Sequence, residues 1–432
     1  MRRVLRSARD KLVDVRPEEI RAVAFAFVFN FVVLASYYVV RPIRDEIGAA
    51  GGLDTLSWMY SGTLVTMLAA NVLFSKLVAH FSRRRFIPLA YRFFIGNLIL
   101  FYFAMRCLSA TQQVWVGRAF FVWVSVFNLF VVTVFWAFMT DVFNTEQAKR
   151  LFGFISVGGT LGAILGAVIT AALVQYVGTM NLLFASALLL EVAAQCVRHF
   201  PFGFRRHRPG ESDRAARDEA PIGGGIWTGM THAIRSPYLL GMCGFLLLYT
   251  ITSTVMYFQQ ADITAHHFHD RAARTAFFAQ LDLSVNVLTV LIQIFLTGRL
   301  LKHLGVGVTL ALLPAISTIG FVAVACAPGL GLVAISQTLR RASNFALSRP
   351  AREVLFTVLT REDKYKAKGF IDTFVYRAGD QIGAWSYPAL TWLGLGITGI
   401  SWLAVPLAGV WFILSLWLGR RQVELAPHPG RS

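Results

Sequence analysis

Apolar runs of about 20 residues recur from one end of the chain to the other, and they constrain the fold more than any other feature. A helix of that length crosses the hydrocarbon core of a bilayer, where every backbone polar group must be paired within the segment. With ends good to a few residues, the twelve runs lie at 22–42, 55–79, 86–107, 114–142, 151–176, 179–199, 237–260, 277–298, 305–327, 329–358, 369–393 and 397–419. They predict an all-α, polytopic membrane protein with twelve transmembrane helices.

The composition supports this prediction. The chain is 56% hydrophobic and 15% charged, whereas about a quarter of the residues of a soluble domain are charged. The first run is too long for a signal peptide and lacks a small-residue cleavage site, so we expect it to be the first permanent helix.

The net charge of +18 records membrane topology rather than binding of nucleic acid. Most Lys and Arg residues fall in the segments that twelve alternating helices place on one side: 1–21, 76–85, 149–150, 198–235, 299–302, 361–368 and 420–431. The opposite side has Arg41, Arg44, Arg106, Arg271 and Arg274. The positive-inside rule therefore predicts cytoplasmic termini and a cytoplasmic central loop, with basic residues that also contact anionic lipids.

A long polar stretch, Pro201 to Gly225, divides six runs from six. We therefore predict an amphipathic segment at 1–20, a six-helix half at 21–199, a central loop at 200–225, a second half at 226–419 and a tail at 420–432. Each half begins with a stretch that has one apolar helical face, typical of a helix lying in the membrane interface. A frayed tail or a linker is the alternative for these two stretches.

The two halves also repeat each other. "EQAKRLFGFI" follows the fourth run and "DKYKAKGFI" follows the tenth, and "GAILGA" at 162–167 is echoed by "GDQIGA" at 379–384. Two ordered matches about half a chain length apart indicate the internal repeat of a 6+6 secondary transporter. The G-x-x-x-G pattern itself predicts close helix packing.

Ionisable groups inside predicted spans cost at least about 2.5 kcal/mol each on insertion scales, so they usually face a cavity or a partner. The eighth run carries a polar stripe and the tenth carries another, with Pro350 predicting a kink. The stripes are Asp282, Asn286, Thr289 and Gln293, then Arg341, Asn344, Ser348 and Arg352. The eleventh run adds Asp372, Arg377, Asp380 and Gln381, of which Arg377 can reach Asp380 or Gln381 on one face.

Further charges lie in or beside the first four runs: Arg41, Arg44, Asp45, Arg92, Arg118 and Asp141. Arg41 to Glu46 should lie near the outer face, where they either snorkel to the interface or line a cavity. Together these groups predict a hydrated, net-positive cavity for an anionic substrate, reached by alternating access. The alternative is interhelical ion pairing that locks the bundle, which we favour for Arg118 and Asp141; we favour the cavity for the two stripes.

Three stretches carry a family resemblance: "VVRPIRDEIG", "FWAFMTDVFNTEQAKRLFGFI" and "KYKAKGFIDTFVYRAGDQIGAW". They resemble the ATP/ADP translocases, nucleotide antiporters with a major-facilitator-like fold, and most closely a branch from free-living bacteria. The resemblance implies a multi-pass transporter of the bacterial inner membrane that exchanges nucleotides or other phosphorylated anions, coupled to a counter-substrate or to protons.

Carried over by position, Arg44 takes the place of a family lysine that binds nucleotide, next to Asp45. Asp372 and Arg377 match an I-D-x-x-x-x-R pattern, and Lys149 and Arg150 match A-K-R after the fourth helix. The chain departs from the family twice: the acid of the seventh helix is missing, and Asp380 stands where a functional lysine is expected. An anion in place of a cation weakens phosphate binding, so the resemblance implies the fold more firmly than ATP/ADP exchange.

Other classes find less support in the sequence. No P-loop, H-E-x-x-H or G-x-S-x-G motif occurs, so we expect neither an enzyme nor a bound cofactor. The cysteines are scattered singly and predict no metal or redox motif. The "HHFHD" segment at 266–270 is better explained as a solvated loop than as a metal or pH-sensing site. A scaffold or lipid-moving protein that kept the fold is the alternative to a transporter.

Overall fold

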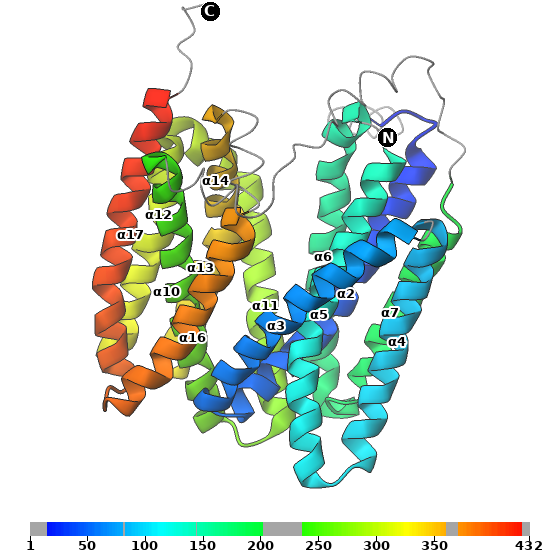
Figure 1. Ribbon diagram of the computed structural model, residues 1–432, viewed down its shortest axis with the longest axis horizontal. Coiled ribbons are helices and arrows are strands. Elements are labelled where there is room, and N and C mark those ends of the chain that lie inside the picture. Colours follow the sequence, from blue (N-terminus) through cyan, green and yellow to red (C-terminus); the bar gives the residue numbers. More distant parts are fainter. Residues whose placement is uncertain (1–14, 81–82, 144, 202–235, 360–369, 426–432) are drawn as a thin grey trace, which may run out of the picture. The chain divides into compact units, whose positions relative to one another are not determined.

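The computed structural model describes residues 15–80, 83–143, 145–201, 236–359 and 370–425 (Figure 1). Within these ranges all regular elements are helices, in the order α2 (Ile20–Ala50), α3 (Leu53–His80), α4 (Arg83–Cys107), α5 (Ala110–Val142), α6 (Thr145–Val177), α7 (Leu182–Arg198), α10 (Pro237–His267), α11 (Arg271–Ile292), η2 (Gln293–Thr297), α12 (Gly298–Cys326), α13 (Leu330–Ser343), η3 (Asn344–Ser348), α14 (Arg349–Leu355), η4 (Phe356–Val358), η5 (Ile371–Val375), α16 (Tyr376–Trp392) and α17 (Ile397–Leu425). The predicted amphipathic starts of both halves and nearly all of the central loop lie outside the described residues.

The predicted all-α, twelve-helix architecture is confirmed, since the described part of each apolar run is helical. Seven of the segments are long and apolar enough by themselves to cross a membrane: Ile20–Ala50, Ile87–Cys107, Ala110–Val142, Arg150–Val177, Pro237–His267, Arg271–Cys326 and Ile397–Leu425. The long segment that starts at Arg271 is broken at Gly305, whose φ of +76° only glycine adopts easily. This turn separates the eighth run from the ninth.

The chain forms two compact units. Unit 1 contains Met1–Gly48, Gly62–Pro209 and Phe268–Leu283; unit 2 contains Ala49–Ser61, Gly210–His267 and Ser284–Ser432. Each unit thus holds most of one sequence half together with a short segment of the other half. The exchanged segments are the start of α3, in unit 2, and the first part of α11, in unit 1.

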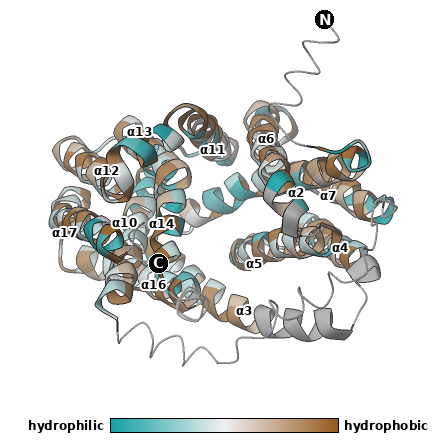
Figure 2. Cartoon of the chain, turned by 90° about the horizontal axis from the view of Figure 1, so that it is seen from above, coloured by the Kyte–Doolittle hydropathy of each residue, from teal (hydrophilic) through white to brown (hydrophobic). Residues whose placement is uncertain are grey.

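Unit 1 has an aromatic core. The fully buried Phe29 of α2 makes edge contacts with Tyr91 of α4 and with Phe135 and Phe138 of α5. Edge-to-face contacts of this kind stabilise a core beyond the area they bury. Hydrophobic residues also dominate much of the surface of the helices of both units (Figure 2), as expected where helices face lipid.

The repeated G-x-x-x-G patterns pack helices closely in both units, as predicted. On α6, a Cβ added to Gly162 would collide with the Phe31 carbonyl of α2, and one added to Gly166 would collide with that of Ala35. On α16, Gly379 and Gly383 lie in the same way against α10. The fifth and eleventh runs therefore pack on the first and seventh, which are equivalent positions of the repeat.

Unit 2 differs from unit 1 in having π-helical turns. Its three are η2, η3 and η5, whereas the described helices of unit 1 have none. A π turn is an insertion that frees backbone carbonyl groups and often marks a functional position. In η3 the Arg349 amide bonds to the Asn344 carbonyl, which leaves the carbonyls of Phe345 and Ala346 available.

The two freed carbonyls of η3 are taken up by η2. Gln293 Nε2 donates to the Phe345 carbonyl at 3.4 Å, and Thr297 Oγ1 donates to the Ala346 carbonyl at 2.9 Å. Pro350 has no amide hydrogen for the Ala346 carbonyl. The kink predicted at Pro350 stays a prediction; what the structure shows just before Pro350 is the π turn η3, held to η2 by side chains.

Candidate functional site

The most unusual charge in unit 2 is Arg340, on the buried face of α13. It is 3% exposed. Its Nη2 donates to Ser253 Oγ of α10 at 3.1 Å and to Gln337 Oε1 at 2.9 Å. Its Nε and Nη1 are buried and have no hydrogen-bond partner among the described residues, and no described carboxylate lies within ion-pair distance of it. A buried cation in this state is costly unless an anion or water compensates it.

The sequence prediction selected the neighbouring Arg341 and missed Arg340. Arg341 is only partly buried, while Ser336, Gln337, Arg340 and Asn344 share the buried face. Both arginines fit a stripe that continues through Asn344, because i+3 and i+4 positions lie on nearly the same side of a helix. The polar character of Ser336 and Gln337 is the sequence signal that favours Arg340.

Asn344 lies one turn beyond Arg340, and its Nδ2 donates to the Tyr249 hydroxyl at 2.8 Å. Of the stripe predicted on the eighth run, Asn286 and Thr289 are buried in unit 2. Gln293 is exposed and belongs to the π-turn contact. Asp282 lies in unit 1, so this stripe is divided between the units.

Two ion pairs follow Arg340 along the chain. Arg352 of α14 lies 3.3 Å from Asp372 of η5. Arg377 lies 3.3 Å from Asp380, three residues later on α16, so the predicted i+3 contact is confirmed. Thr254 Oγ1 of α10 also donates to Asp380 at 3.4 Å.

Gln381 binds the exchanged segment of α3 rather than a charged group. Its Oε1 accepts a hydrogen bond from Ser61 Oγ at 2.9 Å, and Trp385 Nε1 donates to the same Ser61 oxygen at 3.0 Å. The rings of Trp58 and Trp385 meet edge to face at 5.0 Å. The start of α3 is thereby fixed to α16 within unit 2.

Unit 1 has a compact charge cluster at the end of α2. The Arg41 guanidinium lies between two buried carboxylates, 3.8 Å from Asp45 and 3.4 Å from Asp282 of α11. Arg44 lies 3.0 Å from Asp45 and covers the Phe121 ring at 4.0 Å. The structure thus brings together Arg41, Arg44, Asp45 and Asp282, four of the predicted site residues.

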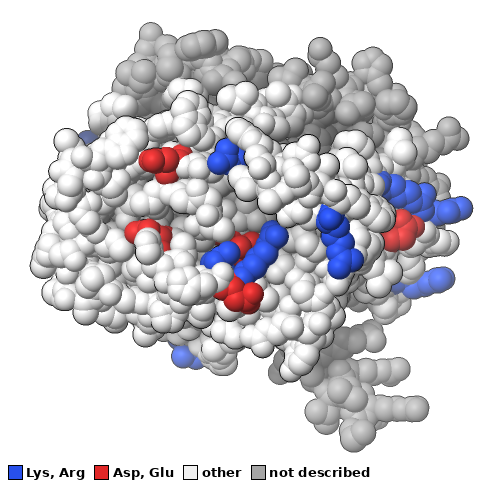
Figure 3. Space-filling model, turned by 90° about the horizontal axis from the view of Figure 1, so that it is seen from below, with Lys and Arg blue, Asp and Glu red and all other residues white. Residues whose placement is uncertain are grey.

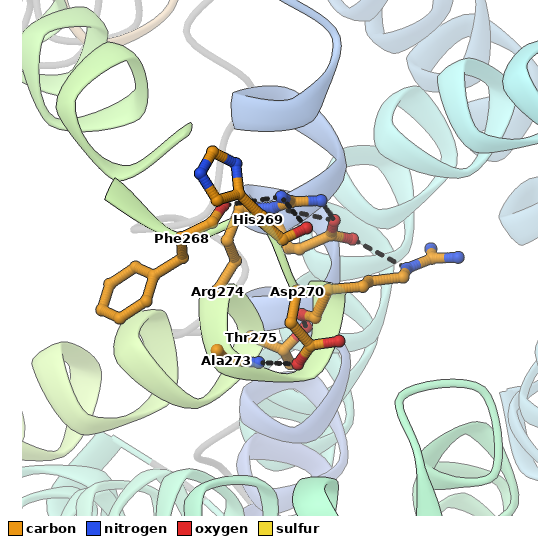
Figure 4. Close-up of polar contacts among 8 residues, drawn as sticks. Phe268, His269, Asp270, Ala273, Arg274 and Thr275 are labelled. Carbon is orange, nitrogen blue, oxygen red and sulfur yellow. Dashed lines mark hydrogen bonds and ion pairs between the residues drawn. The ribbon is translucent and has the colours of Figure 1, made fainter. Parts of the chain in front are cut away.

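Glu46, the last residue of the segment predicted near the outer face, binds two arginines of α11. Its buried carboxylate lies 2.9 Å from Arg271 and 2.9 Å from Arg274. Arg274 Nη1 also donates to the Phe268 and His269 carbonyls, and Asp270 caps the helix by accepting from the Ala273 amide (Figure 4). We call Glu46, Arg271 and Arg274 the Glu46 clamp; it fastens the exchanged part of α11 to α2.

On the face in Figure 3 charged side chains are few, and near its centre basic and acidic groups lie beside each other. In the "HHFHD" segment, His266 pairs with Asp262 at 3.2 Å while Asp270 caps α11. No group of three His, Cys, Asp or Glu residues in the described part of the chain could hold a metal ion.

Arg92 lies apart from the other predicted site residues. It forms a two-bond ion pair with Glu191 of α7 at 2.9 and 3.3 Å, and its side chain is 47% exposed. Arg118 covers the Trp115 ring at 4.5 Å. The Arg92–Glu191 pair joins two helices, α4 and α7, as in the alternative to a cavity, whereas Arg118 and Trp115 both lie on α5.

Comparison with known proteins agrees with the fold. Solved structures that resemble the chain include a POT family transporter in complex with 5-aminolevulinic acid (TM-score 0.64, 10% identity, covering 94% of this chain and 97% of that one). They also include the nucleoside transporter NupG (0.58, 13%, 95% and 100%) and a bacterial homologue of the iron transporter ferroportin in an inward-facing state (0.64, 12%, 92% and 99%). No curated protein sequence matches.

At these identities the solved structures show the fold alone, and nothing among them is specific to ATP/ADP translocases. Residues 22–348, well over half of the chain, match the family described as the Major Facilitator Superfamily. Proteins of this fold are polytopic membrane transporters. The chain therefore belongs to the Major Facilitator Superfamily.

Proposed function

We propose that this protein is a secondary active transporter that moves a small organic anion by alternating access, with Arg340 as the residue that binds the anionic group. The buried guanidinium, with two nitrogen donors that no described residue accepts, carries the proposal. A charge retained inside a membrane helix without a counter-charge marks a ligand pathway by default. An incoming carboxylate or phosphate supplies both the missing charge and the missing acceptors.

The charge balance around Arg340 supports an anionic substrate. The described residues of α13, η3, α14, η5 and α16 include five arginines and three acids. The arginines are Arg340, Arg341, Arg349, Arg352 and Arg377, and the acids are Glu353, Asp372 and Asp380. Since Arg352 and Arg377 pair with Asp372 and Asp380, three arginines and one acid remain, and Arg340 is the buried one of these three arginines.

A nucleotide is one candidate substrate to test, and the proposed function does not depend on it. Arg44, at the family's nucleotide-binding position, is engaged by Asp45 and Phe121. Asp380, in place of a lysine, is held by Arg377 and Thr254. The transporter crystallised with 5-aminolevulinic acid and the nucleoside transporter share only the fold, but they justify small carboxylates and nucleotides as test solutes.

The Glu46 clamp and the Arg41 cluster fit a transport cycle. With both termini on the cytoplasmic side of a bacterial inner membrane, as the basic residues predict, the end of α2 lies at the external side. Opening to that side would then require α11 to leave Glu46 and Arg41. Asp282, Asp372 and Asp380 are the candidate sites for proton coupling, with counter-substrate exchange as the other way to drive transport.

Counterflow in proteoliposomes tests this proposal. Vesicles loaded with one unlabelled anion at a time, from a panel of carboxylates, sugar phosphates and nucleotides, should accumulate a labelled trace of the transported anion. We expect Arg340→Gln to lower this flux at least tenfold and Arg421→Gln, a change of an exposed arginine at the end of α17, to leave it unchanged. Equal flux in Arg340→Gln, or no flux of any anion by folded protein, would contradict the proposal.

A further inference from the structure

Arg340 of α13 contacts the middle of a regular polar stripe on α10. Tyr249, Ser253 and Tyr257 are spaced four residues apart and so share one face of that helix. Ser253 accepts the hydrogen bond from Arg340, and Tyr249 accepts the one from Asn344. The two tyrosines therefore lie one helical turn to either side of Arg340, with Cα atoms about 12 Å apart at 1.5 Å per residue.

Each of these tyrosines is paired with a second tyrosine from another element of unit 2. Tyr257 lies 6.1 Å from Tyr60 of α3, with the ring planes tilted by 50°. Tyr249 lies 6.3 Å from Tyr376 of α16, tilted by 56°. Tyr60, Tyr257 and Tyr376 are partly exposed.

The tyrosines place aromatic rings near Arg340, so this region contains more than a single charge. The buried guanidinium can bind one anionic group, and the aromatic pairs on both sides of it are held by packing on the buried Phe258 and Trp411. Tyrosine rings recognise planar groups through stacking and edge contacts, while their hydroxyl groups bind polar substituents. Binding sites commonly combine such apolar walls with one well-placed charged group.

We infer that the anion carried by this protein has a planar ring within about 12 Å of its anionic group. Arg340 binds the carboxylate or phosphate, and one of the two tyrosine pairs, Tyr257 with Tyr60 or Tyr249 with Tyr376, contacts the ring. This inference rests on the proposed function and specifies its substrate class. Because Arg340 is, among the described residues of this region, the one buried arginine without a counter-charge, a solute with one anionic group fits better than a triphosphate.

Matched pairs of probes distinguish the contribution of the planar ring to binding from that of the negative charge. Benzoate and cyclohexanecarboxylate have the same charge, but only benzoate has a planar ring. AMP and ribose 5-phosphate share the phosphate, but only AMP has a base. Half-saturating concentrations for the thermal stabilisation of the purified full-length protein give the affinity of each probe, and the two pairs distinguish a carboxylate from a phosphate.

We expect the ring-bearing member of at least one pair to bind about fivefold more tightly or better, since aromatic contacts contribute roughly that much. Tyr60→Leu with Tyr257→Leu, or Tyr376→Leu if the other pair binds the ring, should remove the preference and leave anion binding in place. Tyr176→Leu, a change of a tyrosine that is 86% exposed, should alter neither. Arg340→Gln should remove binding of all four probes.

Two results would overturn the inference alone: equal binding within both pairs, or no binding of any probe at millimolar concentration while another anion shows Arg340-dependent counterflow. A ring preference that survives all three tyrosine changes would overturn it as well. If anions bind Arg340→Gln as tightly as the wild type, both the inference and the proposed function fail.

Discussion

Unit 1 and unit 2 use the same helix contact in different surroundings. In both units a glycine-bearing helix packs on the first helix of the repeat: α6 on α2 and α16 on α10. In both units these glycines meet backbone carbonyls of the partner helix, and in unit 2 Gly379 and Gly383 also meet the side chains of Thr250 and Thr254. The same packing rule therefore operates in both units, with threonine side chains added to the contact in unit 2.

The contrast extends to the buried polar atoms and to the helix geometry. Among the described residues, eight in unit 2 and three in unit 1 have a buried side-chain atom without a hydrogen-bond partner; those in unit 2 are Gln259, Gln260, Thr264, Arg340, Arg352, Asp372, Tyr387 and Trp411. The three π turns are in unit 2 as well. Since buried polar groups are normally satisfied and π turns concentrate at functional sites, this difference supports our proposal that the solute binds in unit 2.

The glycine contact gives the largest expected effect. Gly162→Leu in unit 1 should destabilise the protein by about 3 kcal/mol or more, because the new leucine side chain would collide with the Phe31 backbone carbonyl, which cannot move aside. Thermal melting of the detergent-purified protein measures this loss. Gly153→Leu on the same helix is the control, since nothing lies within 4 Å of an added Cβ there. Equal melting temperatures for the two variants would refute the packing.

The Glu46 clamp should give the next largest effect. Glu46→Gln leaves Arg274 without its carboxylate, and breaking a buried ion pair costs about 3 kcal/mol. Arg274→Gln should cost more than Arg271→Gln, because the Arg274 side chain is 13% exposed and that of Arg271 is 40% exposed. We expect cysteine labelling near the end of α2 to become faster in the same order. Equal effects of the two arginine changes would contradict this ranking.

The paired π turns of unit 2 should give a smaller change. Thr297→Val removes the hydroxyl that donates to the Ala346 carbonyl and should lower the unfolding free energy by about 1 kcal/mol. Transport should change more than stability if this contact is used in the cycle. Thr318→Val removes a hydroxyl bonded within its own helix, to the Pro314 carbonyl, and serves as the control. Identical transport by both variants would limit η2 and η3 to a structural role.

The smallest effect concerns acid stability at Glu19, in unit 1 just before α2. Burial raises its pKa, but hydrogen bonds from Gln147, the Arg16 amide and Arg150 outweigh burial, so the pKa is lowered from 4.5. Ionised Glu19 therefore stabilises the protein above about pH 4.5, and this contribution is lost as the pH falls through the lowered value. Melting temperatures of wild type and Glu19→Gln should converge in acid; a constant gap would contradict this.

Much of the fold follows from local sequence signals. Helix positions follow from apolar runs, the close contacts from G-x-x-x-G and the Arg377–Asp380 pair from i+3 spacing, because all three depend on neighbours in the chain. The Glu46 clamp could not be predicted in this way, since Arg271 lies 225 residues from Glu46. The exchanged segments also depend on tertiary packing. Arg340 was missed because adjacent positions of one helix fit the polar stripe almost equally well.

The most direct test of a solute site in unit 2 is to measure flux and melting temperature on the same preparation of Arg340→Gln. Replacing a buried charge that has no counter-charge often leaves a protein equally or more stable. We therefore predict anion counterflow at least tenfold lower than that of the wild type, with a melting temperature unchanged or raised. A lower melting temperature with undiminished flux would show that Arg340 stabilises the helix bundle, and it would contradict a solute-binding role.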